Sequence, residues 1–318
     1  MSNKQQEELI DVVQIDGQVV LKIINHARDN APSEATGLLL GLPIDGRLEV
    51  TNCIPQSKGD DEGANDETQT ALMASLRQVN VDDNTVGWFL ATSISTFFSK
   101  LTIDAQYEYQ SAIPNSICIL LDPYRRHSGK LGLRAFRLTE HFMQVYAKND
   151  FSQNGFSQYG VESGDIMEEV RIQVHNSHLD HAFLYELRES KAMSTNSTLL
   201  GVHLNGPEQQ LESLSLAIDE YTQEQGKYHY YERSMARNKS QQQQWLAKRQ
   251  SENEARAKQG KPALPDDRAK FSFFKPLPKP SRIESMLIVN QLHQTSNAIL
   301  ENCTQGFSKM YVVDALRR

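Results

Sequence analysis

Residues 34–41 read EATGLLLG and residues 86–90 read VGWFL, and these two stretches decide the fold class of the chain. The first is apolar at consecutive positions, which is typical of a strand that is buried on both faces and therefore central in its sheet. Residues 48–54 predict a second strand after the turn PIDG at residues 43–46, so the two strands are expected to form a hairpin. The stretch VGWFL predicts a further short, buried strand.

Strand-like and helix-like patterns alternate on both sides of this hairpin. Residues 12–15 predict a strand, and Val20, Ile23 and Ala27 then recur on one face of a helix. Further along, the patterns predict helices at residues 65–79 and from residue 102, and strands at residues 116–121, 131–138 and 169–174. The alternation indicates an α/β domain in which helices flank a mixed sheet.

The composition excludes several classes of protein. With 318 residues, of which 39% are hydrophobic and 23% charged, the chain is neither collagen-like nor fully disordered. Its three cysteines lie far apart and form no CxxC pair, which argues against a disulfide framework or a cysteine zinc site. We find no targeting segment and no apolar run of about 18 residues, so we expect a soluble cytoplasmic protein that does not enter a membrane.

Charge is distributed unevenly along the chain. The net charge is −7, but residues 233–282 contain 13 lysines or arginines and 4 aspartates or glutamates, a net charge of +9. The rest of the chain therefore carries −16. A basic arm on an acidic body is typical of proteins that meet nucleic acid or an acidic partner, although a solvated linker has the same composition.

The distal half of the chain predicts long helices. From residue 211 apolar side chains recur at heptad spacing, so we expect a helix with a packing seam that continues to residue 260 as a solvated, fraying rod. Five prolines between residues 261 and 280 predict an extended connector, and residues 281–318 predict a final helix with apolar positions on more than one face. Such a helix would be over-exposed alone, so we expect an all-α extension that ends in a bundle helix.

The residues expected to meet partner helices lie on these two seams: Leu211, Leu214, Ile218, Tyr221, Ile288, Leu292, Ile299, Phe307 and Met310. A homodimeric coiled coil is the alternative for the first seam, but its short length and polar breaks favour a bundle of different chains. The expected divisions are the α/β domain at residues 10–150, a strand and helical extension at residues 151–232, a basic rod and linker at residues 233–280 and the bundle helix at residues 281–318.

In their order and placement, EATGLLLG, then VGWF at residues 86–89, then Asp104 resemble the MPN (JAB1/MPN/Mov34) domain family. In the catalytic members of that family, two histidines and one aspartate hold Zn²⁺ and leave one position open for a water molecule. The metal lowers the pKa of that water and a glutamate takes its proton, so that the enzyme hydrolyses isopeptide bonds. The resemblance implies the MPN fold.

Compared residue by residue, the same resemblance implies that the activity is lost. Glu34 matches the general base and Asp104 lies near the carboxylate ligand position, but the two histidine positions hold Leu90 and Thr92, and the serine position holds approximately Leu101. A single carboxylate does not retain zinc in water. We therefore expect an inactive MPN domain with no catalytic residue, no metal, no cofactor and no small-molecule substrate.

The remainder of the chain resembles the h-subunit family of eukaryotic translation initiation factor three. The resemblance lies in residues 122–123 followed by 131–139, and in residues 168–179. It continues in residues 231–233, the Gln- and Arg-rich rod, residues 262–265 and 274–276, and residues 281–285. It implies a non-catalytic scaffold protein whose MPN domain pairs with another MPN subunit, whose helices join PCI-domain subunits, and which supports recruitment of the 40S ribosomal subunit and mRNA scanning. The alternatives are a non-catalytic MPN subunit of a proteasome-lid or signalosome type complex and, less favoured, a cryptic zinc isopeptidase.

A run of histidines has two interpretations. His175, His178 and His181 recur every third residue and, together with His203, suggest a metal site. Zinc needs three or four converging ligands, however, and residues 176–177 read Asn-Ser, which is typical of a helix cap. Ordinary packing is therefore favoured for these histidines.

The basic arm and a pair of phenylalanines each have more than one possible role. Candidate contacts to mRNA or ribosomal RNA are Arg233, Arg237, Lys239, Lys248 and Arg249. Clustered cations are sufficient for phosphate binding, but the arm contains no base-reading motif. Phe97 and Phe98 follow the degenerate ligand positions, where they either form an exposed partner anchor or fill the pocket that holds the metal in catalytic members.

Overall fold

Seven strands close into a mixed barrel within the residues that the structure, a computed structural model, describes: 10–31, 33–44, 46–56, 62–123, 131–190, 205–258 and 277–317. The strands are β1 (Val12–Asp16), β2 (Ala35–Ile44), β3 (Arg47–Gln56), β4 (Thr85–Ala91), β5 (Ile117–Leu121), β6 (Leu133–Leu138) and β7 (Met167–His175). Their order is β1-β3-β2-β4-β5-β6-β7, and β7 pairs back with β1. The sequence patterns predicted the individual strands but not this closure, because the paired residues of β1 and β7, such as Val12 and Arg171, are 159 positions apart in the chain.

The predicted hairpin of β2 and β3 is confirmed. The strand β2 is antiparallel to both β3 and β4 and lies between them. Its two faces enter different apolar clusters, because Leu39 packs in one and Leu38 and Leu40 in another. Consecutive apolar residues in this stretch therefore correspond to burial on both sides of the sheet.

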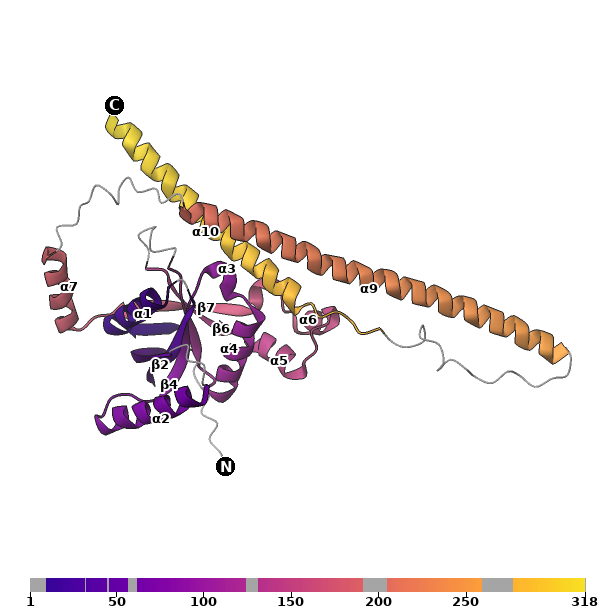
Figure 1. Ribbon diagram of the computed structural model, residues 1–318, viewed down its shortest axis with the longest axis horizontal. Coiled ribbons are helices and arrows are strands. Elements are labelled where there is room, and N and C mark those ends of the chain that lie inside the picture. The colour runs from indigo at the N-terminus through magenta and orange to yellow at the C-terminus, as the bar shows by residue number, and fades with distance from the viewer. Residues whose placement is uncertain are drawn as a thin grey trace.

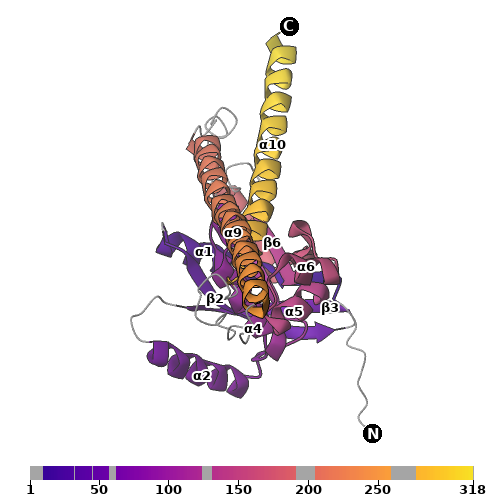
Figure 2. The same ribbon diagram turned by 90° about the vertical axis from the view of Figure 1, so that its right-hand side faces the viewer.

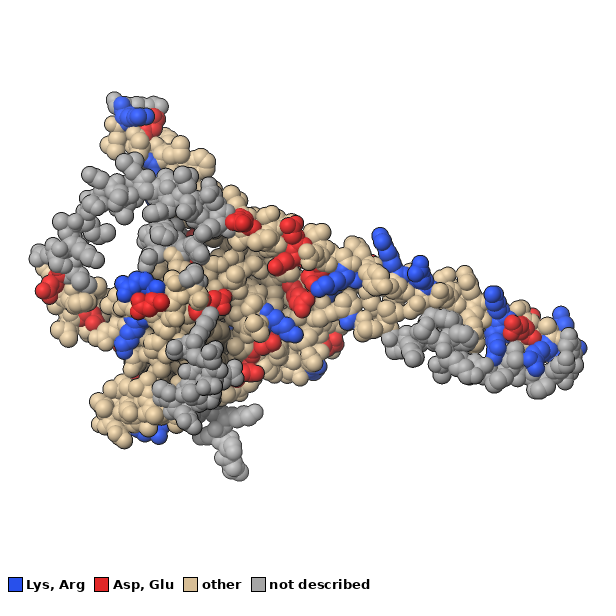
Figure 3. All heavy atoms as spheres, in the orientation of Figure 1, with Lys and Arg blue, Asp and Glu red and all other residues tan. Residues whose placement is uncertain are grey.

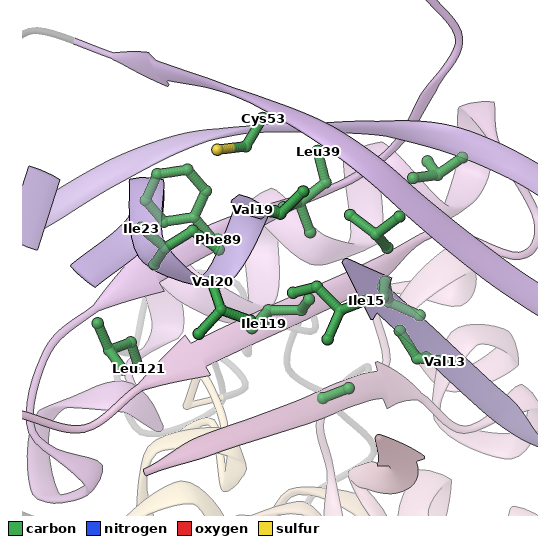
Figure 4. Packing of buried hydrophobic residues seen from close by; sticks show 14 of the residues in the cluster. Val13, Ile15, Val19, Val20, Ile23, Leu39, Cys53, Phe89, Ile119 and Leu121 are labelled. Carbon is green, nitrogen blue, oxygen red and sulfur yellow. The ribbon is translucent and has the colours of Figure 1, made fainter. Parts of the chain in front are cut away.

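The largest apolar cluster lies between the barrel strands and α1 (Gly17–Asn30). Val19, Val20 and Ile23 project from α1 towards the strands, where they meet the residues labelled in Figure 4, among them Leu39 and Phe89. The predicted apolar stripe of this helix thus covers one face of the sheet. A separate helix, α2 (Glu62–Gln78), packs through Met73 and Leu76 against the smaller cluster of β2 and β3.

A second large cluster covers the opposite face of β4, β5 and β6. It is built by the helices α3 (Ile94–Phe97), α4 (Lys100–Ala112), α5 (Glu140–Lys148) and α6 (Gln153–Tyr159), and by residues on either side of the short 3-10 turn η2 (Ser163–Asp165). The helices α5 and α6 were not predicted. Both begin at a side-chain cap, because Thr139 Oγ1 accepts a hydrogen bond from the backbone N–H of Phe142 and Ser152 Oγ accepts one from that of Gly155.

Two of the expected divisions fall inside continuous structure. The strand β7 pairs with β1 and β6, so the barrel extends past the boundary expected at residue 150. The boundary expected at residue 233 lies within α9 (Asn205–Lys258), a single helix of 54 residues. The rod does not fray before Lys258, and residues 259–276, which include most of the expected connector, lie outside the described residues.

The last helix, α10 (Ile283–Arg317), lies against both α9 and the barrel domain (Figures 1 and 2). Ile283 and Leu287 near its start belong to the second large cluster, and Asn302 Nδ2 donates a hydrogen bond to Gln210 Oε1 of α9 at 2.9 Å. From this crossing, the distal part of α9 projects away from the domain in one direction and the end of α10 in another. The helix α10 is therefore packed within the chain from Ile283 to about Asn302.

The helix α7 (His178–Ser190) follows β7 and stands at the side of the domain in Figure 1. Its apolar residues Leu179 and Phe183 are 76% and 50% exposed. In the described part of the chain, no helix combines the length and the apolar character that crossing a membrane requires.

Candidate functional site

Glu34 and Thr92, at the base position and one histidine position of the MPN motif, lie side by side. The antiparallel pairing of β2 with β4 places Ala35 opposite Ala91, so the residues just outside this pair also face each other. Thr92 Oγ1 donates a hydrogen bond to Glu34 Oε1 at 3.0 Å and lies 2.7 Å from Thr96 Oγ1. The carboxylate that serves as base in catalytic members is therefore held by a hydroxyl group here.

The other histidine position points into the apolar core. Leu90 is two residues before Thr92 on β4 and is only 6% exposed, within the second large cluster. Its side chain has no lone pair for a metal and packs in the same cluster as Phe97 and Phe98. This strand therefore supplies no imidazole and no space for one without a change in the core.

Asp104, near the expected carboxylate ligand position, is bound by a residue of another helix. Its Oδ1 accepts a hydrogen bond from the hydroxyl of Tyr146 in α5 at 2.6 Å. Burial raises the pKa of Tyr146 to about 12, and this hydrogen bond and the negative charge of Asp104 add to the effect. Leu101, near the serine position, is 81% exposed. Asp104 thus fastens α4 to α5.

The structure brings Glu34 and Thr92 together but does not assemble a metal centre from the motif. Among the described residues, no group of three or more His, Cys, Asp or Glu side chains converges in a way that could hold a metal ion. Sequence reasoning missed Thr96 and Tyr146, which bind Thr92 and Asp104. The hydroxyl-rich run at residues 92–96 was the available signal for the first, and the sequence contains no signal for the second.

Phe97 and Phe98 fill the interior beside Leu90 and are not an exposed partner anchor. They are 0% and 3% exposed, and their ring centroids lie 5.1 Å apart in an edge-on arrangement. Both also contact Phe136 of β6, at centroid distances of 5.0 and 5.7 Å. The three aromatic rings occupy the core next to the degenerate ligand positions.

The segment that follows Thr92 is covered by the C-terminal helices of the same chain. A groove of about 480 Å³ separates α3 and the start of α4 from α9 and α10, and its walls include Thr96, Lys100, Glu220 and Leu287. A second cavity of about 290 Å³ lies between Ser93–Ser95 and the start of α9. The face that would receive a substrate next to the motif is therefore bordered closely by helices.

The residues predicted to meet partner helices divide into two sets. Five of them are half-buried within this chain: Leu214, Tyr221, Ile288, Leu292 and Ile299. The other four are exposed, with Leu211 at 54%, Ile218 at 49%, Phe307 at 70% and Met310 at 69%. The packed side of α9 includes Ala217, Tyr221 and Tyr228. Leu211 and Ile218 lie to one side of it and are more exposed.

The second half of α10 exposes every large apolar side chain that it carries. From Leu300 to the described end, the exposed residues are Leu300, Phe307, Met310, Tyr311, Val312, Val313 and Leu316, at 50% to 82%. They lie on several faces of α10, which contacts α9 as far as Asn302 and then projects away from α9 and the domain (Figures 1 and 2). A run of seven exposed large apolar side chains therefore lies on a projecting helix.

The start of α10 is fixed to two other parts of the chain. The guanidinium carbon of Arg282 lies 4.3 Å from the ring centroid of Tyr228 in α9, and the backbone N–H of Arg282 donates to the carbonyl of Phe151 at 3.1 Å. A cation over an aromatic face is attractive because of the quadrupole of the ring. These contacts hold the projecting helix to the domain at a defined position.

The histidine run forms a strand end and a helix cap. His175 Nδ1 lies 3.3 Å from Asp16 Oδ1, where β7 pairs with β1. Ser177 Oγ accepts a hydrogen bond from the backbone N–H of Asp180, as the capping interpretation predicts. In return the Asp180 carboxylate accepts hydrogen bonds from the Ser177 hydroxyl and backbone N–H, which lower the pKa of Asp180. His203 lies outside the described residues.

The candidate RNA contacts lie on different faces of α9. Arg233, Arg237 and Lys248 are separated by 4 and 11 residues and so share a face, whereas Lys239 lies on the far side. Arg249 is directed elsewhere, with its guanidinium 5.3 Å from the ring centroid of Trp245 and 4.0 Å from Glu252. Three of the five predicted residues therefore form one continuous surface.

Comparison with known proteins accounts for both halves of the chain. Residues 9–115 match the family described as JAB1/Mov34/MPN/PAD-1 ubiquitin protease, and residues 126–318 match the C-terminal region of eIF3h. A protein of Nematostella vectensis, named as the H subunit of eukaryotic translation initiation factor 3, is 36% identical over 97% of this chain and 95% of its own length.

Two further relatives carry the same name. The Arabidopsis thaliana protein is 38% identical over 96% of this chain and 92% of its own length. The Xenopus tropicalis protein is 36% identical over 98% of this chain and 94% of its own length. The matches extend through the barrel, the long helix and the projecting helix. The chain therefore belongs to the family of H subunits of eukaryotic translation initiation factor 3.

Proposed function

We propose that this member of the family is a non-catalytic scaffold of the cytoplasmic initiation factor 3 complex, and that the second half of α10 is its main assembly surface. The observation that carries the proposal is the row of large apolar side chains from Leu300 to Leu316 on a helix that the rest of the described chain leaves uncovered. An apolar surface of this kind marks a protein interface. Its length, roughly 27 Å for 18 residues, is that of a typical bundle helix.

The anchoring of α10 supports a structural role. Ile283 and Leu287 are buried in the domain and Arg282 contacts both α9 and the α5–α6 connection, so a partner bound to Phe307 is held in a fixed orientation. A rigid helix loses less conformational entropy on binding than a flexible segment would. We expect PCI-domain subunits on this helix.

Two other surfaces extend the proposal. Leu211 and Ile218 are exposed on α9 beside its packed side, and Leu179 and Phe183 are exposed on α7 beside the barrel. We assign the first pair to the same helical bundle and the second to pairing with another MPN subunit. Through these contacts the protein would position the complex for recruitment of the 40S ribosomal subunit and mRNA scanning.

The degenerate motif supports the absence of isopeptidase activity. Leu90 is buried among apolar side chains. Thr92 donates a hydrogen bond to the Glu34 carboxylate, and the Asp104 carboxylate accepts one from Tyr146. Activation of water by zinc requires several protein ligands and an open position.

The test is to replace Phe307 and Met310 together by aspartate in the tagged full-length chain and to identify the proteins that co-purify from cells. We expect the initiation factor subunits to be lost while the thermal unfolding temperature changes by less than about 2 °C, because both side chains are exposed in the free chain. The matched control replaces Val79 and Leu101, which are 72% and 81% exposed, by aspartate. Undiminished recovery of subunits with the first variant, or equal loss with the control, would contradict the proposal.

A further inference from the structure

One exposed face of the distal half of α9 carries cations and amides but no carboxylate. Residues three or four positions apart lie on the same face of a helix. By this spacing one face of α9 carries six residues, which we call the basic face: Arg233, Arg237, Gln241, Gln244, Lys248 and Lys258. All six are exposed, and the positions between Lys248 and Lys258 on the same face hold only Ser251 and Ala255. The row extends for roughly 37 Å along the helix axis.

The charge of α9 changes sign along its length. Between residues 210 and 232 the helix has five acidic residues and one lysine, whereas residues 233–258 have seven basic and two acidic residues. Figure 3 shows red side chains over the part of α9 next to the domain and blue ones along the projecting part. A polyanion is therefore repelled near the domain and attracted to the distal rod.

The two carboxylates of the distal half do not interrupt the basic face. Glu252 lies to one side of it and is 4.0 Å from Arg249, and Glu254 lies to the other side, six residues beyond Lys248. Within the basic face the cations are separated by polar side chains that can donate hydrogen bonds. Arginine and lysine with amide donors are the side chains that bind phosphate oxygens.

The surroundings favour RNA over an acidic protein as the ligand. The core of a protein interface is apolar and depleted of charge, yet no aliphatic residue larger than alanine lies on the basic face. One aromatic residue, Tyr230, extends the same face by one turn towards the domain and is 74% exposed. A base can stack on such a ring while the phosphates that follow it meet the cations.

We infer that the basic face of α9 binds the phosphate backbone of single-stranded RNA, with Tyr230 as a stacking residue at its end. The inference rests on the proposed function, because the complex would bring this rod next to the mRNA or ribosomal RNA. The binding should be independent of sequence and sensitive to salt. Of the candidate cations, Lys239 and Arg249 are excluded from it by their positions.

The test measures fluorescence anisotropy of a labelled 25-nucleotide oligouridylate with the full-length chain at several salt concentrations. Four phosphate contacts predict a slope of log K against log salt of about −3. Replacing Arg237 and Lys248 by glutamate should reduce the magnitude of this slope by about 1.4 and the affinity by roughly tenfold at 100 mM salt. The control replaces Lys239 and Lys100, which are exposed but lie off the face, by glutamate and should retain the slope.

Several outcomes would overturn the inference. Equal losses of RNA affinity in the two double variants would mean that net charge alone is responsible for binding. Tighter binding of a labelled polyglutamate of 25 residues than of the oligouridylate would mean that the basic face binds an acidic protein. A hairpin RNA of 20 base pairs distinguishes a ribosomal helix from a single strand. Tighter binding of the hairpin, or no effect of Tyr230→Leu on oligouridylate binding, would overturn the assignment to single strands.

The result separates this inference from the proposed function. Arg237→Glu with Lys248→Glu should leave co-purification of the initiation factor subunits intact, since the distal half of α9 and the end of α10 project in different directions in Figure 1. Conversely, Phe307→Asp with Met310→Asp should leave the RNA slope unchanged. Loss of both properties in either variant would contradict the assignment of two independent surfaces.

Discussion

Arg282 lies over the ring of Tyr228, with its guanidinium carbon 4.3 Å from the ring centroid, and thereby joins the first turn of the last helix to the middle of the long one. The backbone N–H of the same arginine binds the carbonyl of Phe151, so three segments meet at one residue. The position of α10 on the domain therefore depends on a contact that a single substitution can remove.

Replacing Arg282 by alanine should loosen the start of α10. We expect a loss of about 1 kcal/mol in the free energy of unfolding, the usual value for a partly buried cation over an aromatic ring. Hydrogen exchange of the α10 amides near Leu287 should accelerate. Tyr228→Phe retains the ring and is the control, so equal acceleration in that variant would show that the ring is not the partner.

Gly41 is expected to tolerate no side chain. It lies at an irregularity in the pairing of β2 with β3, and a Cβ atom there would lie 1.8 Å from the carbonyl oxygen of Glu49. Gly41→Ala should therefore cost about 3 kcal/mol or prevent folding, because backbone must shift. Gly226→Ala in α9 meets nothing within 4 Å and should stabilise the helix by about 1 kcal/mol. Urea unfolding of both variants measures whether Gly41→Ala lowers and Gly226→Ala raises the free energy of unfolding.

The three thiols should differ in reactivity. Burial raises the pKa of Cys53 to about 11, against a small opposite effect of Lys22, and burial also raises the pKa of Cys118, whereas Cys303 is exposed on α10. Thiolate is the reactive form, so at pH 8 a thiol reagent should label Cys303 first. Rapid labelling of folded Cys303→Ser would contradict this. Labelling of Cys303 should slow if partner helices cover this half of α10.

The raised pKa of Cys53 makes the contribution of this thiol to folding stability depend on pH. A thiol whose pKa is raised in the folded state keeps its proton more tightly there than in the unfolded chain. Its contribution is therefore fully present below pH 9 and is lost as the pH rises towards 11. Cys53→Ala should flatten the decline in unfolding temperature between these values, which a thermal scan at each pH measures.

Restoring the two histidines should not restore a zinc enzyme. In Leu90→His with Thr92→His, one imidazole would enter an apolar cluster, and Asp104 would still be bound by Tyr146. We expect well under one zinc ion per chain by elemental analysis, and no cleavage of ubiquitin chains, in this variant as in the natural sequence. One equivalent of zinc in either protein would contradict our account of the motif.

Much of the barrel could be predicted from the sequence because its patterns are local. The double-sided burial of β2, with Leu39 on one face and Leu40 on the other, follows from consecutive apolar residues. Closure of the barrel could not be predicted, since the pairing of Val13 with Ile172 leaves no trace in either strand alone. The helices α5 and α6 were missed although Thr139 and Ser152 cap them.

At the degenerate motif, too, local features could be predicted from the sequence and long-range contacts could not. Loss of the histidines at Leu90 and Thr92 is visible in the sequence, but the hydrogen bond between Asp104 and Tyr146 depends on packing between two helices and joins residues 42 positions apart in the chain. The apolar residues of α10 were predicted to meet other chains. Instead Ile283 and Leu287 pack on the domain of this chain and only the second half is exposed, because periodicity shows that a face is apolar and not what covers it.

The docking of Ile283 and Leu287 on the barrel domain also bears on the synthesis of the protein. The last barrel strand ends at His175, about 100 residues before these side chains, so the second apolar cluster stays incomplete while α9 and the linker are translated. At 5 to 20 residues per second, this interval lasts roughly 5 to 20 s. During that time the nascent domain presents an uncovered apolar surface to chaperones. A chain that terminates early, before residue 283, would keep that surface permanently and be a target for degradation.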